Sequence, residues 1–505
     1  MVVVPRAAFA NSSFSEVQGL YQEGQYFKAA RYAFAEVEQD RHLQGSGYAW
    51  ITLSLIQAHL DHAATYFFIK TLQSGDKAAI RRVLSKTEEL IHHVGADILR
   101  KYLIRHTHYE DYDEWNRSAY LYALAKDALL AGQEDRAIGY VNGIQSSSPL
   151  WPFAYQIRGV ANAILGKNDA ALEDFRSCAK RSDDVIISGE GRDSLRVAQS
   201  RREADDLKSR CIASEARTLY QMERFEEADR VYDKIPKGSF VWPDILFEQA
   251  WNAFGRSEYN RTLGKLVTYK SPALSFEFNT EIEVLRAQAY LGLCLYQDAN
   301  ETVNEFNGKY SRVGEEAKHF VEANSSDLGA FYDFGKKALS SSLSSKNTLY
   351  LMADRFVRGP YFQDLVISER EVNAEEAAIQ QFDRLQPGVG HSSSQGFPGF
   401  LSQVLNWRMK SIRLLGGAFV KNSLIDYHSA LISDFEKMAF IKLEMLKRAK
   451  EKLMNPHSGA GDQDRSRGNI EPTRRDDQYR WSFNGEFWND ELGDYVFGLE
   501  SECNK

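Results

Sequence analysis

Small residues recur along this chain at a fixed interval, and that interval decides which architectures the chain can form. Ala29 and Ala63 lie 34 residues apart, and so do many later pairs of alanine or glycine. Between Ala250 and Ala287 the interval lengthens to 37 residues, as one longer connection would produce. A period of this length indicates an array of similar units, in which each unit packs only against its neighbours.

The recurring unit resembles the tetratricopeptide repeat (TPR). That repeat is a pair of antiparallel helices with small residues where the two cross and an aromatic residue at the start of the second. Glycine or alanine at the crossing allows close helix approach. Seven units match, over residues 12–74 and 118–307. The small residues are Gly159, Ala216, Ala250 and Ala287 in first helices and Ala29, Ala63, Ala137, Ala171, Ala228 and Ala299 in second helices. The aromatic position holds Tyr26, Phe225, Tyr259 and Tyr296, and Thr262 replaces one alanine.

The resemblance implies an all-α superhelical solenoid that binds a protein or peptide partner in its concave groove. Family positions that line the groove fall on Tyr122, Lys126, Phe153, Gln156, Arg210, Arg217, Tyr220, Phe247, Trp251 and Phe254. Phe247, Trp251 and Phe254 follow i, i+4, i+7 spacing, so their rings project from one helix face and suit an apolar anchor. A further helix packed on that face would explain them equally well. The lysine/asparagine clamp for C-terminal carboxylates is not reproduced.

Five segments are expected along the chain. They are a residual signal-peptide tail (1–10), the solenoid (11–310), a helical C-terminal domain (311–454), a flexible linker (455–478) and a short β-type capping segment (479–505). Within the solenoid, residues 75–117 are a divergent helical stretch and residues 181–208 an insertion. Residues 388–399 form a glycine/serine loop. Apolar residues continue at helical spacing from 400 to 454, where Gly416-Gly417 is expected to kink or split the helix.

Composition excludes several classes of protein. The chain has 505 residues, of which 43% are hydrophobic, and a net charge of −8. These values are typical of a packed, soluble protein and argue against a dedicated nucleic-acid binder. No apolar stretch approaches the ~20 residues that a membrane-spanning helix needs.

The N-terminus and the cysteines both favour an oxidising compartment. Ala8-Phe9-Ala10 follows a short apolar run, as at a signal-peptidase site, so the mature chain is expected to start at Asn11 and to be periplasmic. A cytosolic terminus with a chance A-x-A motif is the alternative. Four cysteines allow three pairings. Neighbouring helices of the repeat place Cys178 near Cys211, which leaves Cys294 for Cys503. Buried, reduced cysteines are the alternative.

The motifs of nucleotide binding, zinc proteolysis and serine hydrolysis are absent. His106, His108, Glu110 and Asp111 offer metal-binding groups on one segment, but a zinc site needs a fixed four-ligand geometry. We interpret them as a solvated turn. No catalytic residue, cofactor or metal is therefore predicted.

The last 27 residues differ from everything before them. Tyr479, Trp481 and Phe483 alternate with polar residues, and Tyr495, Phe497 and Leu499 alternate again, which predicts a small antiparallel strand pair around a turn at Asn484-Gly485. "EFWNDEL" allows one helical turn that ends at Gly493. Glycoside cleavage needs two carboxyl groups about 5–10 Å apart. Glu486, Asp490 and Glu491 are the candidates for this role, but the surrounding sequence contains nothing that would position a sugar. We interpret the segment as a cap on the repeats.

The sequence therefore predicts a non-enzymatic, periplasmic TPR scaffold that binds a protein or peptide partner. A cell-envelope assembly for secretion, motility or outer-membrane construction is the expected setting, by analogy with exported repeat proteins. No nucleic acid and no membrane span is expected, and the oligomeric state is left open. The alternative is an envelope glycan-binding protein, or a hydrolase or its regulator, that uses the carboxylates of the C-terminal segment.

Overall fold

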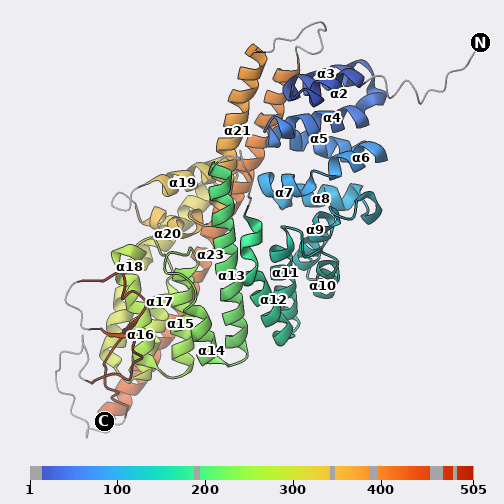
Figure 1. Ribbon diagram of the computed structural model, residues 1–505. Coiled ribbons are helices and arrows are strands. Elements are labelled where there is room, and N and C mark those ends of the chain that lie inside the picture. Colours follow the sequence, from blue (N-terminus) through green and yellow to red (C-terminus); the bar gives the residue numbers. More distant parts are fainter. Residues whose placement is uncertain are drawn as a thin grey trace, which may run out of the picture. The chain divides into compact units, whose positions relative to one another are not determined.

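The computed structural model describes residues 14–186, 194–341, 347–385, 396–454, 470–481 and 486–503, and most of them are helical (Figure 1). The chain forms two compact units. Unit 1 comprises residues 1–211 and 364–412, and unit 2 comprises residues 212–363 and 413–505. Each unit combines repeat residues with helices from beyond position 310. The expected domain boundary at 310/311 is therefore not where the units separate, because those later helices pack on repeats inside each unit.

Unit 1 contains the first four repeats. Their helices are α2 (Ser15–Gln22), α3 (Tyr26–Gln39), α4 (Gln44–Gln57), α5 (Asp61–Gln73), α9 (Arg117–Leu130), α10 (Glu134–Asn142), α11 (Trp151–Ile164) and α12 (Asn168–Lys180). The divergent stretch between them is not one helix pair. It forms α6 (Lys77–Leu84), α7 (Thr87–Val94), α8 (Ala96–His106) and η2 (Tyr109–Asp111). Short 3₁₀ turns lie at η1 (Arg41–Leu43) and η3 (Ser182–Val185).

Unit 2 contains the last repeats and the C-terminal strands. Its elements are α14 (Phe225–Tyr232), α15 (Trp242–Gly255), α16 (Tyr259–Val267), η4 (Thr268–Lys270), η5 (Pro272–Leu274), α17 (Glu281–Gly292), α18 (Tyr296–Ala323), α19 (Leu328–Ser340), α20 (Thr348–Val357), β1 (Tyr479–Arg480) and β2 (Tyr495–Val496). Three helices include residues of both units. They are α13 (Ser194–Gln221), α21 (Pro360–Leu385) and α23 (Phe397–Met454).

The same turn joins the two helices of every repeat. One residue with positive φ ends each first helix, and the residue after it donates its N–H to the carbonyl five positions earlier, as in a Schellman motif. The positive-φ residues are Gly24, His59, Gly132, Gly166, Glu223, Ser257 and Cys294. Seven identical turns therefore define seven helix pairs, and four of these turns lack the glycine that would mark them in a sequence.

Small residues lie where the helices cross, as the repeat pattern predicts. A side chain added at Gly159 would come within 2.6 Å of the Phe175 ring, and one added at Gly292 within 2.4 Å of the Tyr259 ring. The alanines at the other crossing positions are fully buried. Thr262 is buried too, and its hydroxyl donates to the carbonyl of Ala250 over 3.3 Å.

Helix α23 is continuous, so of the kink or split expected at Gly416-Gly417 the split is wrong. Gly417 has a different role, because a β-carbon there would lie 1.9 Å from the carbonyl oxygen of Leu328 in unit 2. The glycine therefore permits close contact between α23 and the start of α19. In unit 1, the beginning of α23 packs on the first repeats, where the Phe397 ring lies 5.0 Å from that of Phe34.

We call residues 470–481 and 486–503 the strap. Its two strands pair in parallel, Tyr479 with Tyr495 and Arg480 with Val496, so the predicted antiparallel pair is wrong. A parallel pair needs a crossover instead of a tight hairpin, and here the crossover includes the turn that ends at Gly493. The residues from Asn489 to Gly493 form turns, not the single helical turn expected.

The strap lies along the side of the repeats of unit 2. Asn260 holds it through three bonds, two between its side-chain amide and the backbone of Leu499 and one from the N–H of Phe497 to its carbonyl. Residues 470–478, expected in the linker, belong to the strap as well, because the N–H of Ile470 donates to Gly498. The strap therefore lies mainly along α16, the second helix of its repeat, and reaches the last repeat through residues 501–503.

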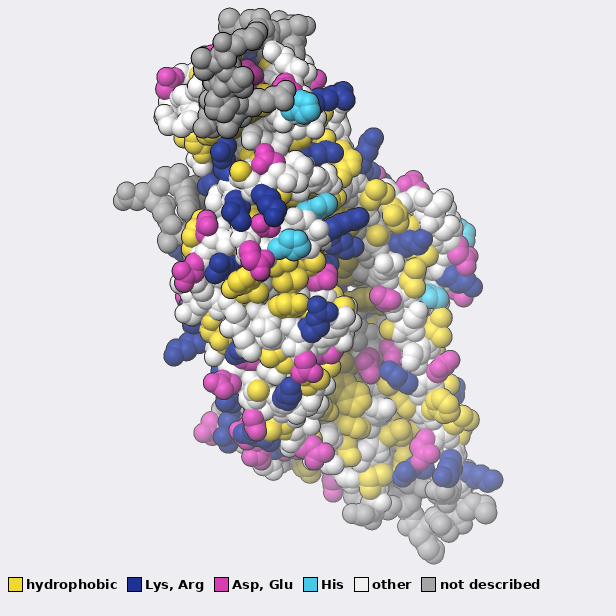
Figure 2. Space-filling model, turned by 90° about the vertical axis from the view of Figure 1, so that its right-hand side faces the viewer, with side chains coloured by type: hydrophobic (Ala, Val, Ile, Leu, Met, Phe, Trp, Pro, Cys, Tyr) yellow, Lys and Arg dark blue, Asp and Glu magenta, His cyan; other side chains and the backbone are white. Residues whose placement is uncertain are grey.

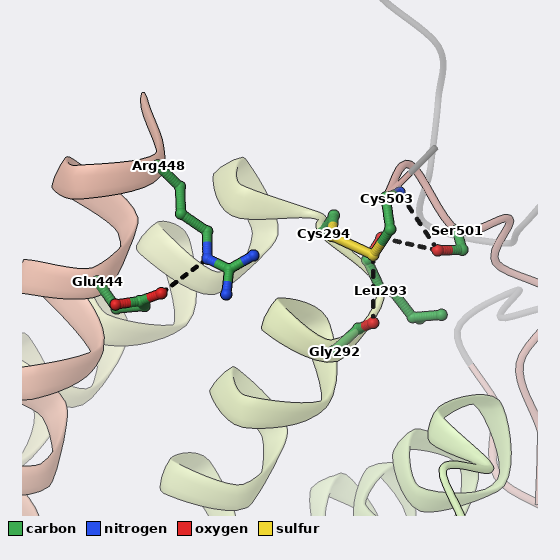
Figure 3. The surroundings of a disulfide bond; sticks show 7 residues. All are labelled: Gly292, Leu293, Cys294, Glu444, Arg448, Ser501 and Cys503. Atoms are coloured by element: carbon green, nitrogen blue, oxygen red, sulfur yellow. Dashed lines mark hydrogen bonds and ion pairs between the residues drawn. A yellow bond between two sulfur atoms is a disulfide. The ribbon is translucent and has the colours of Figure 1, made fainter. Parts of the chain in front are cut away.

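Cys294 is bonded to Cys503, which ties the end of the strap to the last repeat turn (Figure 3). In unit 1, Cys178 is bonded to Cys211. Both are the pairs expected from the sequence. Several other expectations lie outside the described residues: the signal tail, the linker up to 469, the loop at 388–395 and the turn at Asn484-Gly485.

Candidate partner-binding surface

Three aromatic side chains of α15 form a continuous ladder. The ring centroids of Phe247 and Trp251 are 6.4 Å apart, and those of Trp251 and Phe254 are 5.5 Å apart, each pair edge to face. Tyr259, the first residue of α16, extends the ladder with its ring 5.5 Å from Phe254. Edge-to-face contact is a favourable geometry for aromatic rings. The ladder is therefore a pre-ordered surface of four rings.

Each ladder ring is only half buried. One side of the rings of Phe247, Trp251 and Phe254 packs against a buried cluster formed by Ala250, Leu266, Ile282 and Leu285. Tyr269 packs on the same cluster, and its hydroxyl donates to the carbonyl of Pro243. The rings thus contribute to contacts between neighbouring repeats and still present an outer edge.

An ion pair flanks the ladder. Arg217 makes a two-pronged contact with the carboxylate of Glu248, with distances of 2.6 and 3.0 Å, and Glu248 also accepts from the hydroxyl of Tyr232 over 2.9 Å. Glu248 directly follows Phe247. Tyr220 is 37% exposed and stacks edge to face on Phe225. Arg217 is therefore charge-balanced before any partner arrives.

A hollow of about 570 Å³ lies at the start of α15. Trp242, Phe240 and Phe276 give it aromatic walls, and Leu492 of the strap contributes to it. Arg358 and Lys237 also line it, and Lys237 donates to the Asp490 carbonyl and the Asp494 carboxylate of the strap. The sequence analysis missed this hollow, because its walls come from segments more than 200 residues apart. The one sequence signal at this position of the repeat is the Trp-Pro pair with which both α11 and α15 begin.

A buried ion pair supports one wall of the hollow. The Arg355 guanidinium lies 4.0 Å over the Phe240 ring and contacts the carboxylates of Asp244 at 2.6 Å and Glu277 at 3.0 Å. Burial raises the pKa of Glu277 to about 7, against the opposing effect of Arg355. The cation–π contact with Arg355 therefore holds the Phe240 ring in place.

Unit 1 contains a buried polar cluster that the sequence analysis also missed. His62, at the start of α5, accepts from Nε of Arg408 at 3.3 Å through Nδ1 and faces Glu371 at 3.2 Å through Nε2. Glu375 accepts from the N–H groups of His62 and Ala63 at 2.8 and 3.0 Å, so it caps α5 from another helix. A cavity of about 270 Å³ adjoins the cluster.

Burial shifts the pKa values of this cluster in the directions that favour the neutral side chains. The pKa of Glu375 is raised to about 8, and that of His92, which also lines the cavity, is lowered to about 4. His93 beside it adds a smaller lowering effect on the pKa of His92. Across the ranges that the structure describes, no group of three or more His, Cys, Asp or Glu is arranged to hold a metal ion.

Comparison with known proteins adds little to this geometry. No protein-family model matches the chain, and no curated protein matches it either. One similar solved structure is the crystal structure of the TPR domain of P58(IPK), which has 11% sequence identity over 79% of this chain and 99% of that one, with a TM-score of 0.19. The helix pairs of the structure, with small residues at their crossings, are those that the TPR resemblance predicts.

The ten predicted groove residues of these TPR pairs divide between the units. Arg217, Tyr220, Phe247, Trp251 and Phe254 belong to unit 2 and form the ladder and its flank. The other five belong to unit 1: Tyr122, Lys126, Phe153, Gln156 and Arg210.

In unit 1 the predicted groove residues are already engaged. Tyr122 is buried and offers little surface. Lys126 pairs with Asp97 at 3.0 Å and Arg210 with Asp206 at 2.6 Å. Phe153 packs on the cluster around the Cys178–Cys211 disulfide, and Gln156 is half buried.

The remaining chemical candidates lie in exposed turns. Glu486 and Asp490 are exposed, and Glu491 is half buried in the turn before Gly493. In the histidine-rich stretch, the N–H of His108 donates to the carboxylate of Asp111 within η2. None of the helices described is long and apolar enough to cross a membrane.

Proposed function

We propose that this chain is a TPR-type scaffold that binds a protein or peptide partner on the aromatic ladder of α15. The observation that carries the proposal is the edge-to-face order of Phe247, Trp251 and Phe254, each packed on the core cluster and still partly exposed. Rings fixed in this way lose little conformational entropy on binding, and buried aromatics dominate the binding energy of many interfaces.

Several features favour an apolar segment flanked by polar groups as the ligand. The ladder is uncharged, and Arg217 and Glu248 beside it neutralise one another. A partner therefore gains most by placing apolar side chains on the rings. Lys and Arg side chains are interspersed with Asp and Glu side chains over the face drawn in Figure 2, so no single sign of charge dominates that face.

Replacing Trp251 with alanine should weaken partner binding at least about tenfold, equal to roughly 1.4 kcal/mol. Because half of the ring packs on the core, we also expect a loss of stability of about 1–2 kcal/mol. A photo-crosslinking residue at 251 first identifies the partner, with the exposed Glu301 of α18 as the control position. Titration calorimetry with that partner then gives the change in Kd.

The matched control is Leu266→Ala, which removes a buried side chain of the same cluster and leaves the ladder surface in place. It should destabilise unit 2 and leave the affinity of the folded protein unchanged. If Leu266→Ala weakens binding as much as Trp251→Ala, the ladder acts only through the fold and the proposal fails.

We also propose that the mature chain begins at Asn11 and works in the periplasm, within a cell-envelope assembly. The Ala8-Phe9-Ala10 motif supports export, and the two cysteine pairs suit an oxidising compartment. N-terminal sequencing of the protein from fractionated cells should find Asn11 first in the periplasmic fraction. A cytosolic product that retains residues 1–10 would contradict export.

A further inference from the structure

The hollow at the start of α15 is a pocket that the proposed function does not use. Its volume of about 570 Å³ is within the range of small-molecule sites, and all of its lining residues belong to unit 2. None of the ladder residues is among them, so the hollow can bind a ligand independently of the ladder. Most of the lining is apolar: Phe240, Trp242, Pro243, Ala273, Leu274, Phe276 and Leu492.

The aromatic walls of the hollow are in place before any ligand arrives. Arg355 fixes the Phe240 ring, as described above. The strap packs closely on the opposite wall, because a β-carbon at Gly493 would lie 3.2 Å from the Trp242 ring. The N–H of Gly493 also donates to the buried hydroxyl of Thr268 over 3.1 Å. A flat apolar group can therefore enter the hollow without a large cost for ordering its walls.

The polar part of the lining is basic. Lys237 and Arg358 line the hollow, and no Asp or Glu does so among the residues that the structure describes. Lys237 is already bonded to the strap. Arg358 is different, because only its Nε has an acceptor, the carboxylate of Asp354 at 2.9 Å. Asp354 is fully buried and is not a lining residue.

The open edge of Arg358 has a specific chemistry. Its two Nη groups donate to no residue within the part of the chain that is described. A guanidinium held through Nε keeps a second pair of N–H groups side by side, and this pair matches the two oxygens of a carboxylate. A cationic ligand would meet two cations here, and a purely apolar ligand would leave this edge unused.

We propose that the hollow binds a free aromatic carboxylic acid. Its ring lies among Phe240, Trp242 and Phe276, and its carboxylate accepts from the Nη groups of Arg358. This site goes beyond partner binding on the ladder and does not rest on it, because the two share no residue.

Titration calorimetry of the full chain with three naphthyl compounds tests the proposal. Naphthylacetate carries the carboxylate, naphthylacetamide is its neutral counterpart, and naphthylethylammonium is a cation of similar size. Naphthylacetate should bind. The amide should bind at least about tenfold more weakly, because it loses the charge-assisted pair with Arg358. The ammonium compound should not bind.

Arg358→Gln should weaken the binding of naphthylacetate at least about tenfold and leave that of naphthylacetamide nearly unchanged. A merely structural role of Arg358 would weaken both ligands together. Arg312→Gln of α18 is the control, since Arg312 is 88% exposed, pairs with Glu316 and is not a lining residue. It should leave the binding of both ligands as in the wild type.

Phe276→Ala probes the apolar wall and does not disturb the contact between Arg358 and the buried Asp354. The Phe276 side chain is partly exposed, so the thermal melting of this variant should stay close to that of the wild type. Its affinity for both naphthylacetate and naphthylacetamide should fall at least about fivefold, because an aromatic contact is lost.

Four results would overturn the proposal. They are no binding of naphthylacetate, equal binding of acid and amide, equal weakening of both by Arg358→Gln, and unchanged binding in Phe276→Ala. A peptide that ends in naphthylalanine with a free carboxylate separates the two possible sources of the ligand. Tighter binding of this peptide than of naphthylacetate would assign the hollow to a chain end and contradict a free acid.

Discussion

Replacing Cys294 and Cys503 with serine should lower the free energy of unfolding of unit 2 by about 5 kcal/mol. The bond joins residues that are 209 positions apart, so it removes much of the freedom of the unfolded chain. The folded state changes little, because Asn260 and the backbone of Leu293, which accepts from the N–H of Glu502, still hold the strap. Urea unfolding of the double serine variant measures the loss.

The second disulfide is a graded control. Cys178 and Cys211 are only 33 positions apart, so the same model predicts a smaller loss of about 4 kcal/mol, confined to unit 1. Peptide mapping without reductant should recover both pairs from the native protein. Four free thiols in that material, or a Cys294/Cys503 variant as stable as the wild type, would contradict this account.

Lowering the pH from 6.5 to 4 should destabilise unit 1 through His92 by about 3 kcal/mol. The pKa of His92 is about 4 in the folded chain and 6.5 when unperturbed, because burial disfavours the imidazolium. A depressed pKa means that the unfolded chain binds more protons in this range. The stability is therefore complete above pH 6.5 and is lost as the pH falls through 4. The lowered pKa of His62 acts in the same direction.

Urea unfolding at a series of pH values measures this slope, and His92→Gln should remove most of it. His42→Gln is the control, since His42 is exposed in η1 of the same unit and should leave the slope in place. Glu375 acts in the opposite direction over an overlapping range, because its raised pKa gives stability that is fully present below 4.5 and is lost as the pH rises through about 8, so the difference between the wild-type and His92→Gln slopes measures the His92 contribution. An unchanged slope in His92→Gln would show that another group dominates the acid response.

Local sequence pattern was enough for the repeats but not for the turns or the strap. Alanine and glycine at the crossings predict that the two helices of a repeat pack closely, and in the structure they do. This could be predicted because close contact between two helices requires a small side chain at the point of contact. His59, Glu223, Ser257 and Cys294 occupy the left-handed turn without being glycine, so no local signal marked them. The strap was predicted as a hairpin because alternation shows strands but not their partners.

The candidate sites show the same limit. Spacing alone placed Phe247, Trp251 and Phe254 on one helix face, where they form the ladder, but it did not show that Arg217 is neutralised by Glu248. It also gave no hint that Tyr122 is buried. Charge pairing and burial depend on residues that are distant in the sequence. The sequence of one helix does not specify which other helices pack against it.

The sequence by itself determined the helix pairs, their period and the residues at their crossings, because these depend on contacts within about 40 residues. Only the tertiary structure decided how the chain divides into units, which face of α23 stays exposed, and where the strap lies. Those features join segments more than 350 residues apart, as when Phe27 of α3 stacks on Phe382 of α21. Two helices with equal apolar patterns are equivalent until packing selects one partner, and that selection is a property of the folded chain.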